Sequence, residues 1–431
     1  MVAVVIANGA LLAGVALLML GHGLQSTLLG VRASIEEFPT AVTGLIMSAY
    51  FIGFLFGSIV TPRMVKRVGH IRVFAAVASL ASAAILLHIL FITPVAWFFS
   101  RVLTGLCLSS CYIVAESWLN GATDNANRGQ LLSIYMVVQL MALSAGQFLL
   151  GLADPAGFEL FVVCSVLISL AVIPLLLSAS PAPAIATPKT ISLIELYRNS
   201  PLGVIGMAMV GISMGGMFSM GPVFARESGF SLGDIALFMA AINLGGVLLQ
   251  WPIGQLSDRI DRRLVITVVT FLASASLVIP FSLGIDGTYP LVAAFFLFGG
   301  LVMPMYSLLV AHTNDNLDND QMVAASGALV LANGIGAVSG PAMIALVMDW
   351  VGNSGFILAL IGIHLAIGLF ALFRMTRRQA VPLDEQGPHV YIPTPTAVTV
   401  PMAQEEAVEL LTDDEAELPL AATNMPDRSP S

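Results

Sequence analysis

The sequence predicts an all-α integral membrane protein with twelve transmembrane helices in two six-helix bundles. Hydrophobic residues make up 57% of the 431 residues and charged residues only 10%, whereas a soluble globular domain carries about 25% charged residues. Apolar runs of about 20 residues recur along the chain, and each is long enough to cross a hydrocarbon core about 30 Å thick. The runs are continuous and lack the alternation of membrane β-barrel strands, so helices are expected.

The apolar runs fall into two groups of six, and Gly, Pro or charged residues separate them. The gap between the groups contains three prolines, which is typical of a linker. We therefore expect a bundle over residues 1–178, a cytoplasmic linker over 179–200, a second bundle over 201–375, and an acidic, disordered cytoplasmic tail over 376–431. The expected spans cover residues 3–29, 41–60, 73–92, 95–119, 130–151, 158–178, 201–221, 234–254, 264–284, 290–311, 322–348 and 354–373.

Basic residues of the short loops are distributed unevenly between the two sides of the membrane. Lys and Arg of such loops favour the cytoplasmic side. Thirteen fall on one side, together with both termini and the linker, and only Arg32 and Arg226 fall on the other. This asymmetry predicts a multi-pass protein of the plasma membrane with both termini in the cytoplasm.

The net charge of the chain resides in its tail. Residues 381–431 hold ten acidic residues and one Arg, and this difference equals the formal net charge of −9. The run Glu405–Glu417 alone carries seven acidic residues. Such a composition favours disorder, although the spaced Val and Leu of residues 403–418 could form one or two amphipathic turns. A docking or regulatory role is the alternative, and we expect that deletion of the tail leaves transport intact.

The two halves of the chain repeat each other weakly. A shift of 192 residues places Met239 on Met47, Gly245 on Gly53 and Arg259 on Arg67, so the basic loops of the two halves coincide. Two parallel six-helix halves related by an axis along the membrane normal are a known plan of transporters.

A specific motif lies in each of these basic loops. The segment Gly254–Arg263 reads GQLSDRIDRR, and its counterpart from Pro62 to Arg72 reads PRMVKRVGHIR. The first resembles the GxLxDRxGRR signature of the major facilitator superfamily; the second departs from it, with Lys66 in place of the usual Asp. The sequence RVLTG from Arg101 resembles the RxxxG element of the same superfamily, and the chain from about residue 10 to 375 resembles its YcaD-type bacterial group.

This resemblance implies a rocker-switch carrier whose halves tilt about a central cavity, driven by an ion gradient, commonly of protons. It implies a small-molecule substrate but does not identify it, and it leaves uptake or efflux open. The chain lacks a GxxxxGK[ST] loop and an HExxH motif, which disfavours an ATP-driven pump and a metalloprotease. We expect no enzyme activity, cofactor, metal or nucleic acid, and a monomer in the lipid bilayer. A receptor or scaffold that reuses the fold is the main alternative, and an enzyme acting on lipid is a lesser one.

Ionisable residues at membrane depth are costly and are functional candidates. Arg101 and Glu116 lie fifteen residues apart in the fourth span, so a helix places them about 22 Å apart. Arg101 is a candidate to bind substrate or gate protons; alternatively it reaches the headgroups beside Trp97. Glu116 is a candidate proton acceptor, but we favour a structural ion pair with Arg67 or Arg72.

Several further polar residues are candidates for the substrate or proton pathway. His22, between two glycines in the first span, can titrate near neutral pH, although it could equally bond a neighbouring helix. Uncharged polar residues line cavities or hold helices together. Those in this set are Gln25, Tyr112, Gln139, Asn243, Tyr306 and Asn333.

The loop charges predict a latch at the cytoplasmic end. In the fold that the resemblance implies, Lys66 and Arg67 face the loop before the eleventh span, where three aspartates occur, and Asp258 faces Arg128. Opposite charges would hold this end shut in the outward-open state; alternatively all are ordinary solvated charges. The predicted gating residues are Lys66, Arg67, Gly69, Arg128, Gly254, Asp258, Arg259, Arg262, Asp315, Asp318 and Asp320.

Overall fold

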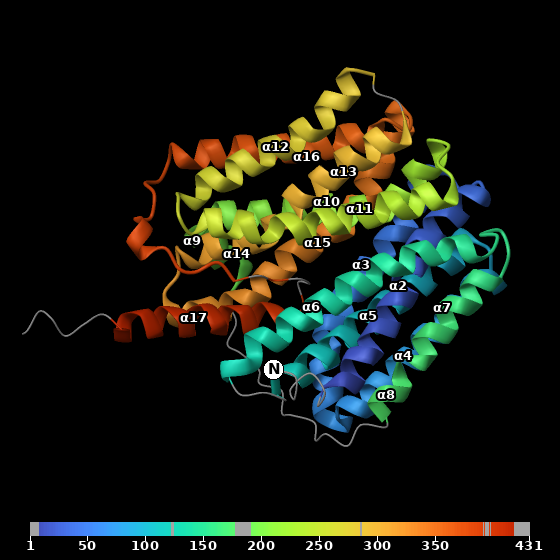
Figure 1. Ribbon diagram of the computed structural model, residues 1–431, viewed down its shortest axis with the longest axis horizontal. Helices are drawn as coiled ribbons and strands as arrows, with labels where there is room; N and C mark the ends of the chain where they lie inside the picture. The colour runs from blue at the N-terminus through green and yellow to red at the C-terminus, as the bar shows by residue number, and fades with distance from the viewer. Residues whose placement is uncertain are drawn as a thin grey trace, which may run out of the picture.

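The computed structural model describes residues 8–121, 125–176, 191–284, 287–390, 392, 396 and 398–417. The described part of the chain contains helices and no strand, and twelve helical stretches in it are long and apolar enough to cross a membrane. The prediction of twelve spans is therefore confirmed. Figure 1 shows the helices of the two halves as two neighbouring bundles, with α17 below the C-terminal half and beside one end of the N-terminal half.

The N-terminal half contains the first six spans. Its helices are α2 (Gly9–Ile35), α3 (Thr40–Val68), α4 (His70–Leu90), α5 (Pro94–Gly121), α6 (Asn125–Phe148), α7 (Glu159–Leu170) and α8 (Val172–Leu176), with a short 3-10 turn η1 (Leu149–Leu152) after α6. The helices α7 and α8 together form the sixth span.

The C-terminal half contains the other six spans and the tail. After a short linker helix α9 (Leu193–Asn199) come α10 (Pro201–Glu227), α11 (Leu232–Ser257), α12 (Arg262–Ser282), α13 (Thr288–Val302), α14 (Met305–Asn314), α15 (Asn319–Val351) and α16 (Gly355–Met375). The tenth span is interrupted between α13 and α14 beside Pro304, which lacks an N–H for the helical ladder. The tail contains η2 (Leu383–Glu385) and α17 (Thr399–Glu417).

The first span ends later than expected. Helix α2 continues to Ile35 instead of ending near residue 29, and Arg32 lies within its last turn. The Arg32 guanidinium pairs with Glu36 at 2.6 Å and donates to the carbonyl oxygen of Pro155 at 2.9 Å. Because its charge is satisfied in this way, the helix continues through a residue that hydropathy places in a loop.

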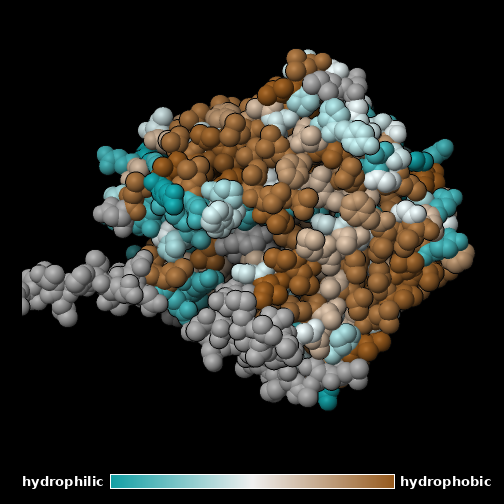
Figure 2. Space-filling model, viewed as in Figure 1, coloured by the Kyte–Doolittle hydropathy of each residue, from teal (hydrophilic) through white to brown (hydrophobic). Residues whose placement is uncertain are grey.

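The two ends of the bundle differ in charge. We call the end that carries the α3–α4, α11–α12 and α14–α15 connections the charged end, and the other the opposite end. Figure 2 shows hydrophobic residues over most of the flank in view and hydrophilic ones toward its edges. Large apolar side chains such as Phe56, Leu248 and Leu369 are exposed on the outside of the helices, as lipid contact requires.

The internal repeat has a structural counterpart in two helix crossings. A Cβ atom built on Gly53 of α3 would lie 1.9 Å from the carbonyl oxygen of Val102 in α5. A Cβ atom on Gly245 of α11 would lie 1.9 Å from the carbonyl oxygen of Phe296 in α13. Both crossings bring backbone against backbone, which only glycine allows. The same residue of each repeat therefore fixes the same pair of helices.

The described part of the tail contains a long helix, although the composition of the segment favours disorder. Helix α17 packs on α15 and touches α5, so it contacts both halves. Its inner face contains buried apolar residues, including Val400, Met402 and Ala407. These spaced apolar residues bury against the bundle and offset the cost of ordering an otherwise acidic segment.

Candidate functional site

A cavity of about 250 Å³ lies between the two halves. Its wall comes from α2, α3, α5 and α6 on one side and from α10, α14 and α15 on the other, and one tail residue, Ile392, completes it. The lining is mostly aromatic, aliphatic and thioether side chains, with few polar groups among them. Such a cavity, apolar with a small number of convergent polar groups, is typical of a small-molecule site.

The charged group of this cavity is Arg101. Its guanidinium lies over the ring of Tyr50, with Cζ 4.5 Å from the ring centroid, and only 4% of the residue is exposed. The ring of His22 also stacks on the ring of Tyr50, at a centroid distance of 5.6 Å. Among the described residues, none with a carboxylate pairs with Arg101, and its Nε and Nη1 have no hydrogen-bond partner. The residue faces the cavity and does not reach the membrane surface beside Trp97, which is fully buried.

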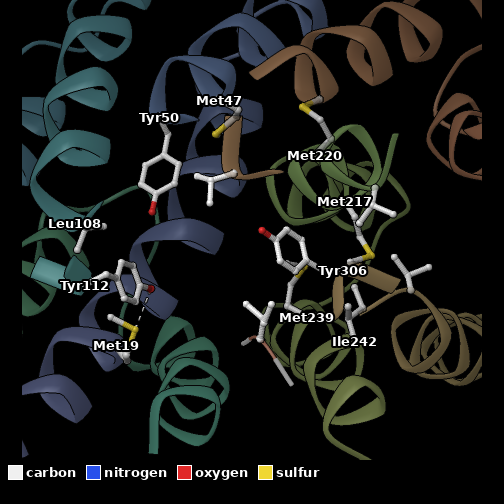
Figure 3. Packing of buried hydrophobic residues seen from close by; sticks show 14 of the residues in the cluster. Met19, Met47, Tyr50, Leu108, Tyr112, Met217, Met220, Met239, Ile242 and Tyr306 are labelled. Atoms are coloured by element: carbon white, nitrogen blue, oxygen red, sulfur yellow. Dashed lines mark hydrogen bonds between the residues drawn. The ribbon is translucent and has the colours of Figure 1, made fainter. Parts of the chain in front are cut away.

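The C-terminal half contributes neutral polar groups to the cavity. Tyr306 follows the interruption at Pro304, and Figure 3 shows its hydroxyl pointing toward the N-terminal half, across from Tyr50 and Tyr112. Within the described part of the chain this hydroxyl has no hydrogen-bond partner. Asn333 of α15 donates from Nδ2 to the carbonyl oxygen of Met207 at 3.3 Å and also lines the cavity.

At the opposite end the two halves touch directly. A Cβ atom on Gly44 of α3 would lie 2.4 Å from Cβ of Ala345 in α15, and one on Gly30 of α2 would lie 2.9 Å from Cβ of Pro222 in α10. The amide of Ala342 donates to the Ser48 hydroxyl at 3.3 Å. These contacts bring helices of both halves together, so the cavity is closed at this end.

At the charged end a buried ion-pair network holds the tail. Arg262, 1% exposed, donates from Nη1 to both carboxylate oxygens of Asp315 at 2.6 and 2.8 Å. Its Nη2 donates to Asp258 at 3.1 Å and to the tail carbonyl of Gly387 at 2.7 Å. Burial raises the pKa of Asp315 to about 6, against the opposing effect of the Arg262 charge. Burial also lowers the pKa of His389 in the tail to about 4, so this ring is neutral at neutral pH.

Glu116 has different partners from those expected. The side chain is fully buried, and its carboxylate accepts hydrogen bonds from the hydroxyl of Tyr135 at 3.2 Å and from the hydroxyl of Thr396 in the tail. Among the described ion pairs, none joins Glu116 to Arg67 or Arg72. The preferred interpretation of an ion pair with these arginines was therefore wrong for this conformation, because Glu116 points into the bundle, where the tail provides a hydroxyl donor.

The structure brings together five of the nine residues predicted for the pathway. Those that line the cavity are His22, Arg101, Tyr112, Tyr306 and Asn333. Gln25, Gln139, Asn243 and Glu116 are buried between helices and are not among its lining residues. Sequence reasoning missed Tyr50, which contacts both Arg101 and His22. A signal for it exists, because Tyr50, Phe51 and Phe54 place aromatic rings on α3 at helical spacing.

One residue of the predicted latch, Asp315, has a different partner from the predicted one. Asp315 pairs with Arg262 of its own half. Gly254 packs against the tail residue His389, and a Cβ atom built on Gly254 would lie 2.8 Å from Nδ1 of His389. The side chains of Arg128 and Asp320 lie outside the described part of the chain. Because the latch belongs to the state in which the charged end is shut, the pairing of Lys66 with these aspartates stays a prediction.

The comparisons with known proteins decide the family. The model of the Major Facilitator Superfamily matches residues 11–341 and, in a second match, residues 244–410. The chain belongs to the major facilitator superfamily. This superfamily membership agrees with the resemblance that the loop motifs carry, and it makes the protein a multi-pass membrane transporter and not an enzyme.

Curated relatives span nearly the whole chain. The superfamily member YcaD of Escherichia fergusonii, an uncharacterised MFS-type transporter, is 29% identical over 376 residues, which are 86% of this chain and 97% of that protein. An uncharacterised MFS-type transporter of Yersinia enterocolitica is 28% identical over 381 residues, 86% of this chain and 96% of that protein. The predicted similarity to the YcaD-type group is thus confirmed.

Solved structures share the fold. The nucleoside transporter NupG superposes with a TM-score of 0.71 at 13% identity, over 86% of this chain and 100% of that one. A bacterial homologue of the human lysosomal transporter Spinster, in an inward-facing and occupied conformation, superposes with a TM-score of 0.67 at 14% identity, over 90% of this chain and 99% of that one. At such identities the likeness concerns the fold and not the substrate.

Proposed function

We propose that this superfamily transporter is a secondary carrier that moves a small molecule by alternating access between its two halves, coupled to a proton gradient. The observation that carries the proposal is the cavity between the halves, closed at the opposite end by direct contacts between helices of both halves. A cavity at the interface of two repeated bundles, closed on one side, is what rocking of one bundle against the other requires.

The orientation of this carrier follows from its loop charges. The sequence assigns thirteen Lys and Arg residues of the short loops and linker to the side of the charged end, and only Arg32 and Arg226 to the opposite side. The positive-inside rule therefore places the charged end, the linker and the tail in the cytoplasm of a bacterial inner membrane. In this orientation the structure corresponds to a state closed toward the outside.

Proton coupling is supported by the chemistry of the cavity. His22 is a titratable group in its wall, and it shares the ring of Tyr50 with Arg101. Protonation of His22 would add a second positive charge beside the guanidinium, so proton and substrate occupancy would affect each other through electrostatics. One neighbour of similar fold is a fucose:proton symporter by name, with a TM-score of 0.54.

The proposal is tested with the purified protein in proteoliposomes. The vesicles are placed in a bacterial metabolite extract under an imposed pH gradient, and mass spectrometry identifies compounds that enter or leave faster than in protein-free vesicles. We expect at least one compound whose movement depends on the protein and on the gradient. Movement that is independent of the gradient would contradict proton coupling, and no protein-dependent movement in either direction would contradict transport.

A further inference from the structure

We propose that the cavity binds an organic anion with an apolar body, and that Arg101 is the group that binds its negative charge. This inference rests on the proposed function for its biological meaning, but it concerns binding and can be tested without flux. Three properties of the cavity, taken over the described residues, support it: a buried cation without a counter-ion, a lining without a carboxylate, and an aromatic wall.

The Arg101 guanidinium is buried, and no described residue provides a counter-ion for it. A guanidinium removed from water is costly unless a negative group pairs with it. The contact with Tyr50 supplies part of that stabilisation through the face of the ring, at 4.5 Å. Two guanidinium nitrogens, Nε and Nη1, have no partner in the described part of the chain, so each has an N–H group that a carboxylate or phosphonate can accept from.

The rest of the cavity selects the body of the ligand. Phe51 and Phe54 of α3 and Met214 and Phe218 of α10 are among the lining residues, and the described lining contains no Asp or Glu. A cationic ligand would meet the like charge of Arg101 with no acid to offset it. A strongly polar ligand would lose its hydration to apolar walls that cannot replace it. An anion with an aromatic or aliphatic body meets neither penalty.

The test uses the full-length protein in nanodiscs and compounds in matched sets of three. Each set has one apolar body bearing a carboxylate, a primary amide or an amine: for example 3-phenylpropionate, 3-phenylpropionamide and 3-phenylpropylamine, with benzoyl and octanoyl sets beside it. Binding is measured by calorimetry. We expect the acid of at least one set to bind tenfold or more tightly than its amide and its amine. An acid that binds no tighter than its amide in every set, including no binding at all, overturns the inference.

Variants assign the preference to Arg101. Arg101→Gln should remove the acid preference, and Arg101→Lys should retain part of it. Arg226→Gln, which makes the same charge change at an exposed residue of the opposite end, should leave it unchanged. Acid binding that survives Arg101→Gln contradicts the assignment. If the flux assay shows that only neutral or cationic compounds are carried, this inference is contradicted but the transport function is not. If the protein binds acids selectively but carries no compound, the transport function is contradicted but this inference is not.

A second, independent observation concerns the tail: we infer that its described residues 387–390, 392, 396 and 398–411 form an autoinhibitory plug that closes the cavity at the charged end. The segment is fixed to the C-terminal half first. The tail amide of Gly387 donates to Asp315 at 3.1 Å while its carbonyl oxygen accepts from Arg262 at 2.7 Å. Two residues further on, the amide of His389 donates to Asp258 at 3.0 Å. The superfamily signature of this half therefore binds the tail backbone.

The segment then reaches the interior and the other half. The amide of Ile392 donates to the Ser307 hydroxyl at 2.9 Å, and its side chain, 3% exposed, is part of the cavity wall. Thr396 donates to Glu116 of α5, which belongs to the N-terminal half. Helix α17 follows and packs on α15. The tail thus contacts both halves, and one of its residues, Ile392, forms part of the cavity wall.

This arrangement has a consequence for the transport cycle. Alternating access needs the charged end to admit or release substrate, and it needs Lys66 or Asp258 free to form contacts across the halves. A docked tail contributes Ile392 to the cavity wall and occupies the Asp258 carboxylate. Undocking must therefore precede release at this end, and removal of the tail should increase access, contrary to the expectation drawn from composition alone.

The test measures access to the cavity in nanodiscs, where both membrane faces are open to a reagent. The three native cysteines, Cys107, Cys111 and Cys164, are buried and are replaced by Ala. Ser26→Cys then places one thiol in the cavity wall, and its reaction rate with fluorescein-5-maleimide is measured. We expect the rate to rise at least tenfold when the chain is shortened to residues 1–380. An equal rate in the full-length and shortened chains overturns the inference.

Point variants keep the test decisive if the shortened chain does not fold. Thr396→Val removes the hydroxyl that Glu116 accepts from, and it should accelerate the Ser26→Cys reaction several-fold. Thr376→Val is the matched control, because Thr376 is exposed and its hydroxyl donates to its own helix at Phe373. A rate for Thr396→Val equal to that for Thr376→Val would contradict the plug.

Discussion

The glycine crossing of α3 and α5 allows a quantitative prediction for Gly53→Ala. The new Cβ would lie 1.9 Å from the Val102 carbonyl oxygen and 2.9 Å from the Leu106 nitrogen. Ordinary contacts begin near 3.5 Å, so α3 and α5 must part by about 1.5 Å. Both clashing atoms are backbone, which places the cost at the upper end of overpacking, about 3 kcal/mol. Alanine recovers about 1 kcal/mol of helix propensity, which leaves a net loss of about 2 kcal/mol.

The assay is unfolding in nanodiscs, followed by the reaction of a thiol-sensitive dye with the native cysteines. Cys107 and Cys111 lie on α5 just after the crossing and are buried, so the dye reports on this helix pair. A loss of about 2 kcal/mol raises the unfolding equilibrium constant about thirty-fold. Gly362→Ala is the matched control, because Gly362 lies within α16 with nothing within 4 Å of its added Cβ, and it should be neutral or slightly stabilising.

The repeat extends the prediction to the other half. Gly245→Ala meets the Phe296 carbonyl oxygen at the same 1.9 Å and should be destabilising to a similar degree in the same background. The dye would report it only if the halves unfold together, so circular dichroism is measured in parallel. If Gly53→Ala unfolds like Gly362→Ala, the close crossing does not exist and the reasoning is refuted.

Two further predictions concern charges of the loops. Asp261 is partly buried, which by itself raises its pKa, but the hydrogen bonds and charge of Arg263 outweigh this and hold the pKa below its usual range. The ionised Asp261 therefore stabilises the folded state above the unfolded-state pKa of about 3.9, and this contribution is lost as the pH falls below it. The difference in free energy of unfolding between the parent protein and Asp261→Asn should shrink at such low pH. A difference that is independent of pH would contradict this. Lys66→Asp should impair transport in the flux assay, and Asp318→Lys should partly restore it. If neither Asp318→Lys nor a like change at Asp315 or Asp320 restores transport, the latch between the halves is not formed by these pairs.

The spans were predictable because their signal is local. A continuous apolar run identifies a membrane helix without knowledge of its neighbours, and all twelve were expected. The interruption at Pro304 and the extension of α2 past Arg32 depend on partners elsewhere, such as the Pro155 carbonyl, 123 residues further on. Hydropathy does not register such partners.

The site was predictable only in part for the same reason. Arg101, His22 and Tyr306 were singled out because polar groups at membrane depth are unusual, and all three line the cavity. The partner of Glu116 is Thr396, 280 residues away in a segment whose acidic composition favours disorder. The pairing of Asp315 with Arg262 within one half likewise depends on the conformation of the protein, which sequence does not specify.

The central claim, that the two halves move against each other, is tested most directly by a reversible cross-link at the opposite end. Ser48→Cys with Ala342→Cys joins α3 to α15 where the Ser48 hydroxyl lies 3.3 Å from the Ala342 amide. Ser82→Cys with Ser165→Cys joins α4 to α7 within one half, where the hydroxyls lie 2.7 Å apart, and serves as the control.

Protein-dependent movement of compounds is measured in proteoliposomes before oxidation, after oxidation and after reduction. Alternating access predicts that the link between the halves abolishes this movement and that reduction restores it, while the link within one half leaves it unchanged. Movement at the parental rate with the halves fully cross-linked at Ser48 and Ala342 would contradict the account.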